Sequence, residues 1–278
     1  MGNTPDVSRA AAYKSSAQPR IVALGGHEFR SQPAERAIVR HLLELTGVEN
    51  PRVCLLPTAS GDPHQSISDF YSVLDRFECR PTHVSLFRME REWVDLRDHL
   101  TSQDLVYAAG GSMLNLIAIW RAHGLTEIMR EVWESGVLLA GQSAGAMCWF
   151  EHGITSSAGS PRVAEGVGFI PGTLSVHYAR DPARRTCLLE EVKQGLPAGY
   201  GIDDGAGLLF EGTRPVEAFA GRKGARVVRI EPGDGESEPV REMALRPIPL
   251  KPEMAPSTDF AIAEMRELRR ARAKALRT

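Results

Sequence analysis

The chain has 278 residues, of which 42% are hydrophobic, and a formal net charge of -2. A chain of this length and composition can bury a full core, and we expect one domain rather than two small ones. The near-zero net charge excludes a global attraction to nucleic acid or to an anionic membrane, so neither is expected as a partner. The four cysteines are scattered without a CxxC pair, which predicts no metal site and no disulfide framework.

The two ends of the chain differ from its centre. Residues 1–18 are polar and without periodicity, which predicts a disordered leader that lacks the apolar core of a signal peptide. No apolar run approaches the roughly 18 residues that span a bilayer, so we expect a cytoplasmic protein. We expect the domain over residues 19–250 and a basic C-terminal helix within 251–278, packed through an apolar stripe.

Apolar runs alternate with helical patterns in the first half of the domain. The runs fall at 20–26, 52–58, 82–87, 104–111 and 136–141, and the helical patterns lie near 33–47, 63–77, 113–122 and 125–135. Shorter strands are predicted at 173–178, 199–212, 215–221 and 225–232. Continuous apolar runs separated by helices predict an α/β fold with a parallel sheet covered on both faces. The later strands are expected to complete this sheet and add a β-rich flank.

Glycines and small polar residues end several of these strands, as in Gly110–Gly111–Ser112 and Gly141–Gln142–Ser143. Ligands of open α/β sheets bind beyond the carboxyl ends of the strands, so we look for chemistry at this edge. Between Gly141 and Gly145, Ser143 fits a tight strand-to-helix turn that projects a nucleophile. The amide of Ala144, with Gly111 on the neighbouring loop, would then stabilise an oxyanion. The alternative is a serine that only caps the helix.

A serine nucleophile needs a base, and histidine is the usual one near neutral pH. Four of the eight histidines are candidates by position. They are His27 and His64 in loops after strands, His152 after the turn, and His177 at the end of an apolar strand. Spacing alone does not choose among them.

Six segments of the chain together resemble the peptidase E family of serine peptidases, which includes aspartyl dipeptidases and, more distantly, cyanophycinases. They are "RIVALGG", "PRVCLLPTASGD", "AGGSMLNLIAIWRAHGL", "GVLLAGQSAGAMCWFE", "GVGFIPGTLSVHY" and "LPAGYGIDDGAGLLFEG", in family order over roughly residues 20 to 230. The resemblance implies a parallel-sheet three-layer sandwich like that of the class I glutamine amidotransferases, with serine where those enzymes use cysteine.

The resemblance also implies roles for individual residues. It makes Ser143 the nucleophile, His177 the general base, and the amides of Gly111 and Ala144 the oxyanion donors. Because the family recognises an acidic N-terminal residue, Arg184 and Arg185 are expected to contact substrate, as is Gly110. The resemblance implies no cofactor.

The chain departs from the family at the residue expected to orient the histidine. Close relatives tend to read Thr-Asp-Ser there, whereas this chain reads Thr155-Ser156-Ser157. Loss of the orienting carboxylate costs about four orders of magnitude in rate in a well-studied serine protease. Four other acids are candidates to replace it: Asp204, Glu165, Asp203 and Glu151. A Ser–His dyad working slowly is a further alternative.

The sequence therefore predicts two alternative functions. The first is a serine hydrolase that cleaves a short peptide or amide, with an acidic N-terminal residue as the expected preference. The second is an impaired or repurposed family member that binds a peptide or metabolite in the former cleft. Neither needs a cofactor or a metal, and a homodimer is left open.

Overall fold

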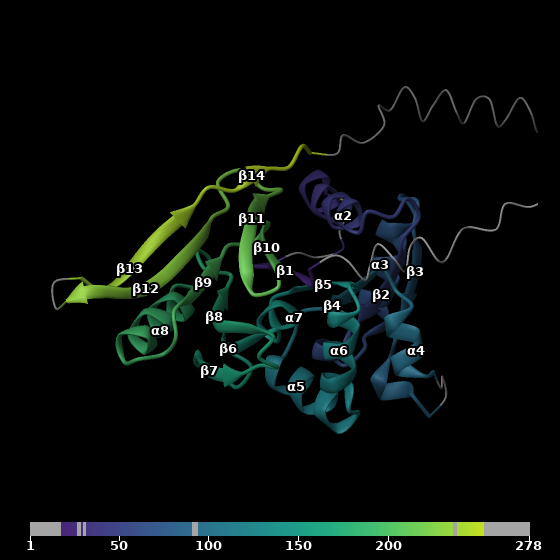
Figure 1. Cartoon of the computed structure of the whole chain (residues 1–278), viewed down its shortest axis with the longest axis horizontal. Coiled ribbons are helices and arrows are strands. Elements are labelled where there is room, and N and C mark those ends of the chain that lie inside the picture. Colours follow the sequence, from purple (N-terminus) through teal and green to yellow (C-terminus); the bar gives the residue numbers. More distant parts are fainter. Residues whose placement is uncertain (1–17, 27–28, 30–31, 91–93, 236–237, 253–278) are drawn as a thin grey trace, which may run out of the picture.

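The computed structural model describes residues 18–26, 29, 32–90, 94–235 and 238–252 (Figure 1). Among these residues, the larger sheet has eight strands in the order β14-β11-β10-β1-β5-β4-β2-β3. In chain order they are β1 (Arg20–Leu24), β2 (Arg52–Leu56), β3 (Arg80–His83), β4 (Leu105–Ala108), β5 (Leu138–Gln142), β10 (Ala206–Glu211), β11 (Arg214–Ala220) and β14 (Ile248–Pro249). Strands β1, β5, β4, β2 and β3 pair in parallel, which confirms the predicted α/β class and parallel sheet.

Helices cover both faces of this sheet. They are α2 (Pro33–Leu45), α3 (His64–Leu74), α4 (Leu96–Thr101), α5 (Met113–Ala122) and α6 (Leu125–Glu134). Alternate residues of β1 belong to different packing layers, because successive strand side chains point to opposite faces. Val22 and Leu24 share a buried cluster with residues of α2 and α3. Ile21 and Ala23 share another with residues of α5 and α6, so the sheet is the middle layer of three.

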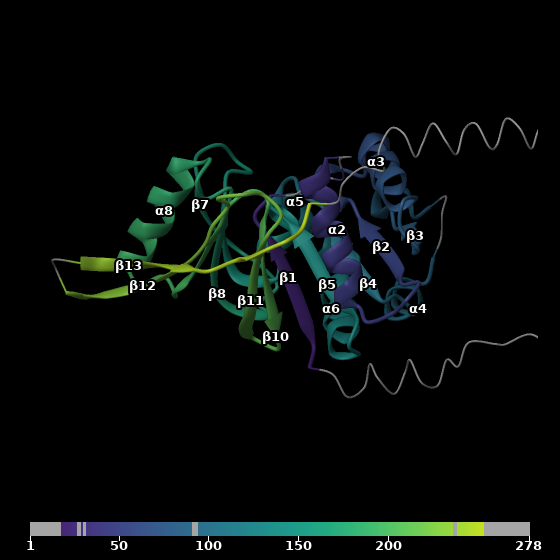
Figure 2. The same cartoon turned by 90° about the horizontal axis from the view of Figure 1, so that it is seen from above.

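A second sheet of six strands lies beside the first and carries helix α8 (Pro182–Lys193) (Figure 2). Its order is β13-β12-β9-β8-β6-β7. The strands are β6 (Phe150–Thr155), β7 (Arg162–Glu165), β8 (Ile170–Val176), β9 (Gly199–Ile202), β12 (Val227–Gly235) and β13 (Glu238–Leu245). The β-rich flank predicted from the sequence is therefore a sheet of its own, in which β8 lies in parallel between β6 and β9.

Several local predictions differ from the structure, among them the strand expected at 199–212, which is divided between β9 in the smaller sheet and β10 in the larger one. The helix expected after Ser143 is the four-residue α7 (Ala144–Met147), because the chain continues at once into β6, which pairs with β7 and β8. The strand expected at 82–87 is β3, shifted toward the N-terminus, followed by the short 3-10 helix η2 (Leu86–Arg88). The strand ends there because the Asp62 carboxylate accepts hydrogen bonds from the Ser85 hydroxyl at 2.7 Å and the Phe87 amide at 3.1 Å.

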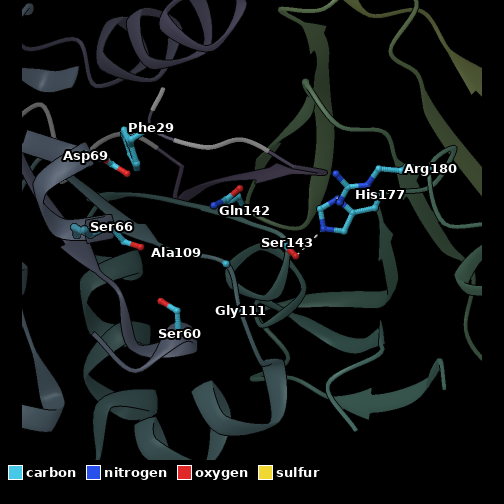
Figure 3. Close-up of a pocket in the computed structure, with 12 residues that line it drawn as sticks. Phe29, Ser60, Ser66, Asp69, Ala109, Gly111, Gln142, Ser143, His177 and Arg180 are labelled. Carbon is cyan, nitrogen blue, oxygen red and sulfur yellow. Dashed lines mark hydrogen bonds between the residues drawn. The ribbon is translucent and has the colours of Figure 1, made fainter. Parts of the chain in front are cut away.

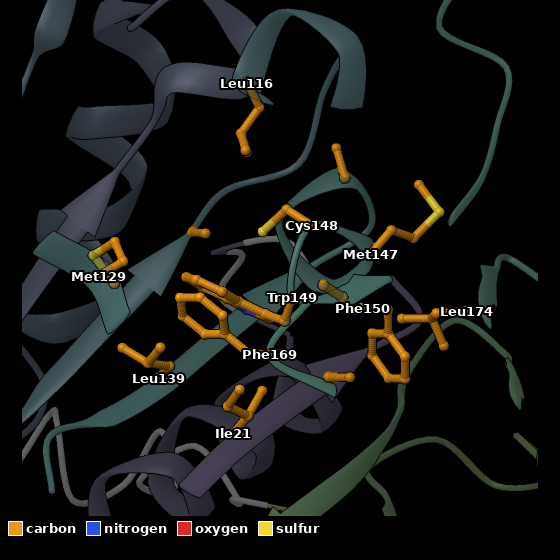
Figure 4. Packing of buried hydrophobic residues seen from close by; sticks show 14 of the residues in the cluster. Ile21, Leu116, Met129, Leu139, Met147, Cys148, Trp149, Phe150, Phe169 and Leu174 are labelled. Atoms are coloured by element: carbon orange, nitrogen blue, oxygen red, sulfur yellow. The ribbon is translucent and has the colours of Figure 1, made fainter. Parts of the chain in front are cut away.

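A layer of aromatic side chains lies under the turn between β5 and β6 (Figure 4). Trp149 is fully buried, with its ring centroid 5.3 Å from that of Trp120 and 5.8 Å from that of Phe169. Burial of such large rings contributes heavily to core stability. The turn that carries Ser143 therefore packs against a buried aromatic layer.

The predicted leader and C-terminal helix lie outside the described residues, apart from Gln18, Lys251 and Pro252. Within the part of the chain that the structure describes, no helix is long and apolar enough to cross a membrane.

Candidate active site

Ser143 occupies a strained turn between β5 and α7. Its φ of 52° and ψ of −117° lie in a region that non-glycine residues seldom adopt. Glycines make the turn possible, since a Cβ on Gly141 would lie 2.0 Å from the carbonyl oxygen of Gly145. A Cβ on Gly145 would lie 2.1 Å from the carbonyl oxygen of Ala108 on β4. The backbone is thus packed too closely for a side chain at Gly141 or at Gly145.

The imidazole of His177 faces the Ser143 hydroxyl (Figure 3). Its Nε2 lies 2.9 Å from Oγ of Ser143. His177 directly follows β8 and has a positive φ of 57°, so both members of the pair sit on constrained backbone. The two side chains that the sequence analysis assigned to one site therefore lie within hydrogen-bond distance.

Asp204 is the acid that the structure brings to His177. The Nδ1–H of His177 donates to Oδ1 of Asp204. Asp204 is held there by a bridge to Gly26, reinforced by the Gly205 amide, which donates to the Gly26 carbonyl at 2.8 Å. A carboxylate only accepts, so Nδ1 must carry the proton and the neutral ring keeps Nε2 bare for the serine proton.

Arg180 neutralises the second oxygen of the same carboxylate. Its Nη1 lies 2.9 Å from Oδ2 of Asp204. Its Nη2 lies 3.0 Å from Nδ1 of His177, but a guanidinium only donates, so no hydrogen bond forms there while Nδ1 is protonated. Burial raises the pKa of the Asp204 carboxyl, but the hydrogen bond and charge of His177 and the charges of Arg180 and Arg222 outweigh it. The net shift of the Asp204 pKa is downward, which keeps the orienting group ionised.

The other candidate acids have different partners. Asp203 accepts from the amide of Ala179 at 2.8 Å and from that of Arg226 at 2.9 Å. Glu151 accepts from the amide of Gly172 at 2.8 Å. These carboxylates therefore fix local backbone.

Glu165 is not brought to the imidazole either. It lies on β7 with a side chain that is 79% exposed, and its nearest cation is Arg121, at 3.8 Å. The expectation that it could orient His177 does not fit this placement, because β7 is the edge strand of the second sheet.

Ser156, where the family resemblance leads us to expect aspartate, also lies away from the imidazole. Its hydroxyl accepts from Nε of Arg184 at 3.1 Å, and the same Nε lies 3.1 Å from Oδ2 of Asp181. Nη1 of Arg184 is buried without a hydrogen-bond partner among the described residues. Burial lowers the pKa of Arg184, an effect partly offset by Asp181. Position 156 therefore faces a buried guanidinium, and a carboxylate there would pair with Arg184.

Arg185 is committed elsewhere as well. Its Nε donates to Oε1 of Glu242 on β13 at 2.9 Å, and its guanidinium carbon lies 5.9 Å from the centre of the Tyr178 ring. Neither Arg184 nor Arg185 lines the cavity at Ser143, contrary to the expectation that they contact substrate.

The two other candidate bases that the structure describes, His64 and His152, have different surroundings. His64 lies at the start of α3, where its Nε2 accepts from Nη2 of Arg88 at 2.8 Å. His152 lies on β6, and its Nδ1 is buried without a hydrogen-bond partner among the described residues. His27 lies outside the described residues.

A cavity of about 440 Å³ opens in front of Ser143. It is lined by Phe29, Leu55, Ser60, Ser66, Asp69, Ala109, Gly110, Gly111, Gln142, Ser143, His177 and Arg180. Pockets of this volume accept small ligands. Gly110 adjoins the serine, since a Cβ on it would lie 3.2 Å from Cβ of Ser143.

Two backbone amides near the serine differ in exposure, since Gly111 is exposed and Ala144 is fully buried. The amides of Gly111 and Ala144 donate to no backbone carbonyl of the described residues. The Gly111 loop is held by the Ser112 amide, which donates to the Ala59 carbonyl at 2.8 Å, and Gly111 has a φ of 146°. Free amides beside a nucleophile are the donors that stabilise oxyanions.

Three residues of the site were missed by sequence reasoning: Gly26, Arg180 and Asp69. The first had a signal, because "GG" ends the first predicted strand at the active edge. A Cβ on Gly26 would lie 2.2 Å from Oδ1 of Asp204 and 2.9 Å from Nδ1 of His177. The roles of the two charged residues depend on how α3 and the loop after β8 face the cavity, which spacing does not reveal.

Nothing in the described part of the chain points to a metal or a reactive thiol. No group of three or more His, Cys, Asp or Glu side chains suited to a metal ion occurs among these residues. Cys148, close in sequence to the turn that carries Ser143, is buried, and burial raises the pKa of its thiol well above the ordinary value. The reactive side chain of this edge is therefore the serine.

A strained serine with an imidazole and a carboxylate in line behind it is the arrangement that serine hydrolases use. The model of Peptidase family S51 matches residues 21–217. The chain therefore belongs to Peptidase family S51, and membership places it among peptidase-type hydrolases.

Individual relatives agree with this assignment. The chain is 36% identical over 233 residues to the uncharacterized peptidase YgaJ of Bacillus subtilis (strain 168), covering 84% of this chain and 98% of that protein. It is 23% identical over 216 residues to a cyanophycinase of Synechococcus elongatus, covering 74% of this chain and 66% of that protein.

Solved structures share the fold. A peptidase from an acI-B1 actinobacterium superposes with a TM-score of 0.62 at 21% identity, covering 84% of this chain and 96% of that chain. A Listeria monocytogenes EGD-e protein assigned to peptidase E gives a TM-score of 0.55 at 14% identity, covering 73% and 99%. The three-layer fold expected from the family is thereby confirmed.

Replacing Ser156 with aspartate should stabilise the fold without changing the reactivity of Ser143. The new carboxylate would pair with the buried guanidinium of Arg184, and we expect the free energy of unfolding to rise by about 1–2 kcal/mol. Chemical denaturation measures this, with Ser156→Asn as the uncharged control. A large increase in the rate at which a fluorophosphonate labels Ser143 would show instead that position 156 supplies the acid to His177.

Gly26→Ala should slow labelling of Ser143 at least about 10-fold, because the added methyl displaces the Asp204 carboxylate or the imidazole from line. Gly159→Ala adds the same methyl where no atom lies within 4 Å, and although its φ of 103° strains an alanine, the strain lies away from the His177–Asp204 pair, so the labelling rate of the folded variant should stay at the wild-type value. Equal labelling rates for both variants would contradict the close packing of Gly26 against the His177–Asp204 pair.

Proposed function

We propose that the chain is a serine peptidase that hydrolyses a short peptide or amide through Ser143. The observation that carries the proposal is the line of contacts from the Ser143 hydroxyl through His177 to Asp204. Nε2 of His177 takes the hydroxyl proton as Oγ attacks the carbonyl carbon, and then returns it to the leaving amine. An acyl-enzyme remains; water then attacks its carbonyl carbon and gives a proton to Nε2 of His177, which passes that proton to Oγ of Ser143 as the acid product leaves.

The amides of Gly111 and Ala144, which have no backbone acceptor among the described residues, are proposed to receive the oxyanion of the tetrahedral intermediate. Removing one such donor costs about 100- to 1,000-fold in rate in a well-studied protease, so the pair would supply much of the acceleration. Ala144 directly follows the serine and Gly111 lines the same cavity, which supports this role. Gly110 would let the substrate backbone approach Ser143, because it presents no side chain.

An impaired or repurposed protein is the competing function. It was favoured by the missing carboxylate at position 156, since an unsupported imidazole loses its fixed tautomer. The contact between Asp204 and His177 supports the active peptidase instead, because the imidazole has an acid behind it.

A substrate with an acidic N-terminal residue is the preference that the family resemblance suggests. We propose that Arg180 receives its carboxylate, in place of Arg184 and Arg185. Arg180 lines the cavity and its side chain is 67% exposed, so its remaining N–H groups are open to a ligand. A planar guanidinium suits a carboxylate.

A fluorophosphonate probe tests the proposed chemistry without knowledge of the substrate. We expect stoichiometric labelling of Ser143, loss of labelling in Ser143→Ala and His177→Ala, and about 100- to 10,000-fold slower labelling in Asp204→Asn. Mass spectrometry of the labelled peptide identifies the site. Ser60→Ala is the control, because this cavity hydroxyl donates to the Pro57 carbonyl and has no imidazole partner among the described residues. A folded wild-type protein that takes no label would favour the binding function.

A further inference from the structure

The cavity has a second charged wall, opposite the catalytic pair. Ser66 and Asp69 project from α3 on the far side of the cavity from Ser143 and His177 (Figure 3). Apart from His177, the ionisable side chains among the described residues that line the cavity are those of Arg180 and Asp69. One charge of each sign therefore stands at opposite ends of the space in front of the nucleophile.

The two charges differ in how they are compensated. Arg180 is paired with Asp204 at 2.9 Å. The Asp69 carboxylate accepts from the amide of Gln65 at 2.7 Å, and no basic side chain of the described residues forms an ion pair with it. A carboxylate has about four acceptor positions, so most of its capacity is unused. Asp69 thus presents a net negative charge to the cavity.

Aromatic rings make the surroundings of Asp69 less polar. Phe29 lines the same end of the cavity, with its ring 5.0 Å from that of Phe70 and 4.9 Å from that of Tyr107. Low-dielectric walls strengthen the attraction between a fixed charge and an opposite charge that enters the cavity. A cationic ligand would therefore be held more firmly here than at an exposed carboxylate.

We propose that Asp69 is a specificity residue that binds a protonated amine of the substrate. This inference rests on the proposed function, because it places the amine on the same peptide whose carbonyl faces Ser143. The carboxylate accepts charge-assisted hydrogen bonds from the ammonium group, and these fix the peptide in one orientation across the cavity. Together with Arg180, Asp69 makes the cavity complementary to a short peptide that carries both charges.

The ammonium group has two sources, the free N-terminus of the peptide or a basic side chain. The test uses four probes that separate them: aspartyl-leucine and lysyl-leucine, each with a free and with an acetylated N-terminus. Binding to the full-length Ser143→Ala chain is measured by calorimetry, which avoids turnover. Asp69→Asn removes the charge at constant shape, and Asp75→Asn is the matched control, since Asp75 is exposed at the C-terminal end of the same helix.

We expect the Ser143→Ala chain to bind a peptide that keeps the recognised amine about 10- to 100-fold more tightly than a peptide in which that amine is absent or acetylated. Adding Asp69→Asn should abolish this difference, whereas adding Asp75→Asn should preserve it. If acetylation weakens both dipeptides, the N-terminal amine is the group bound. If acetylated lysyl-leucine still binds in an Asp69-dependent way, the basic side chain is.

Equal dissociation constants with and without Asp69→Asn would overturn the proposal, as would binding of none of the four peptides. Labelling of Ser143 by fluorophosphonate in the wild-type chain is read separately. Absence of labelling with intact amine recognition would reject the peptidase chemistry alone. Intact labelling with no effect of Asp69→Asn would reject the amine site alone.

Discussion

The site depends on one close backbone contact, between the turn after β5 and the end of β4. Gly145 lies so near the Ala108 carbonyl, and Gly141 so near the Gly145 carbonyl, that neither position has room for a Cβ. This packing holds Ser143 in a positive-φ conformation, with φ 52° and ψ −117°, that costs about 1–3 kcal/mol when adopted alone. The buried aromatic layer under the turn, centred on Trp149, stabilises the surroundings enough to hold it there.

The remaining chemistry comes from the junction of the two sheets. Ser143 follows β5 of the larger sheet, whereas His177 follows β8 of the smaller one. Asp204 lies between β9 and β10, one strand of each sheet, and its bridge to Gly26 ties this connection to the end of β1. The alignment of hydroxyl, imidazole and carboxylate therefore depends on the relative position of the two sheets. A preorganised line of this kind needs little rearrangement during reaction.

Much of this was predictable from the sequence, for physical reasons. Ser143 lies between glycines after an apolar run, and the parallel strands of the first half have continuous apolar patterns because both faces are buried. His177 needed the family resemblance, since four histidines fitted by position. The acid was left among four carboxylates, because pairing of Asp204 with His177 depends on the bridge to Gly26 across the fold. Arg184 was misplaced for a similar reason: α8 turns it toward Ser156, while Arg180 faces the cavity. Strands β6 and β7 were not predicted, because the sequence after Ser143 favours a helix. The helix that forms there, α7, ends after one turn.

The central claim is that Asp204 holds His177 with its proton on Nδ1 and its Nε2 bare toward Ser143. Nitrogen-15 NMR of protein labelled in histidine tests it directly, because the two ring nitrogens have different chemical shifts when protonated and bare. A His177→Gln spectrum assigns the resonances. We predict that the neutral His177 ring is protonated on Nδ1, and that Asp204→Asn removes this preference. A neutral ring protonated on Nε2 in the wild-type chain would contradict the account.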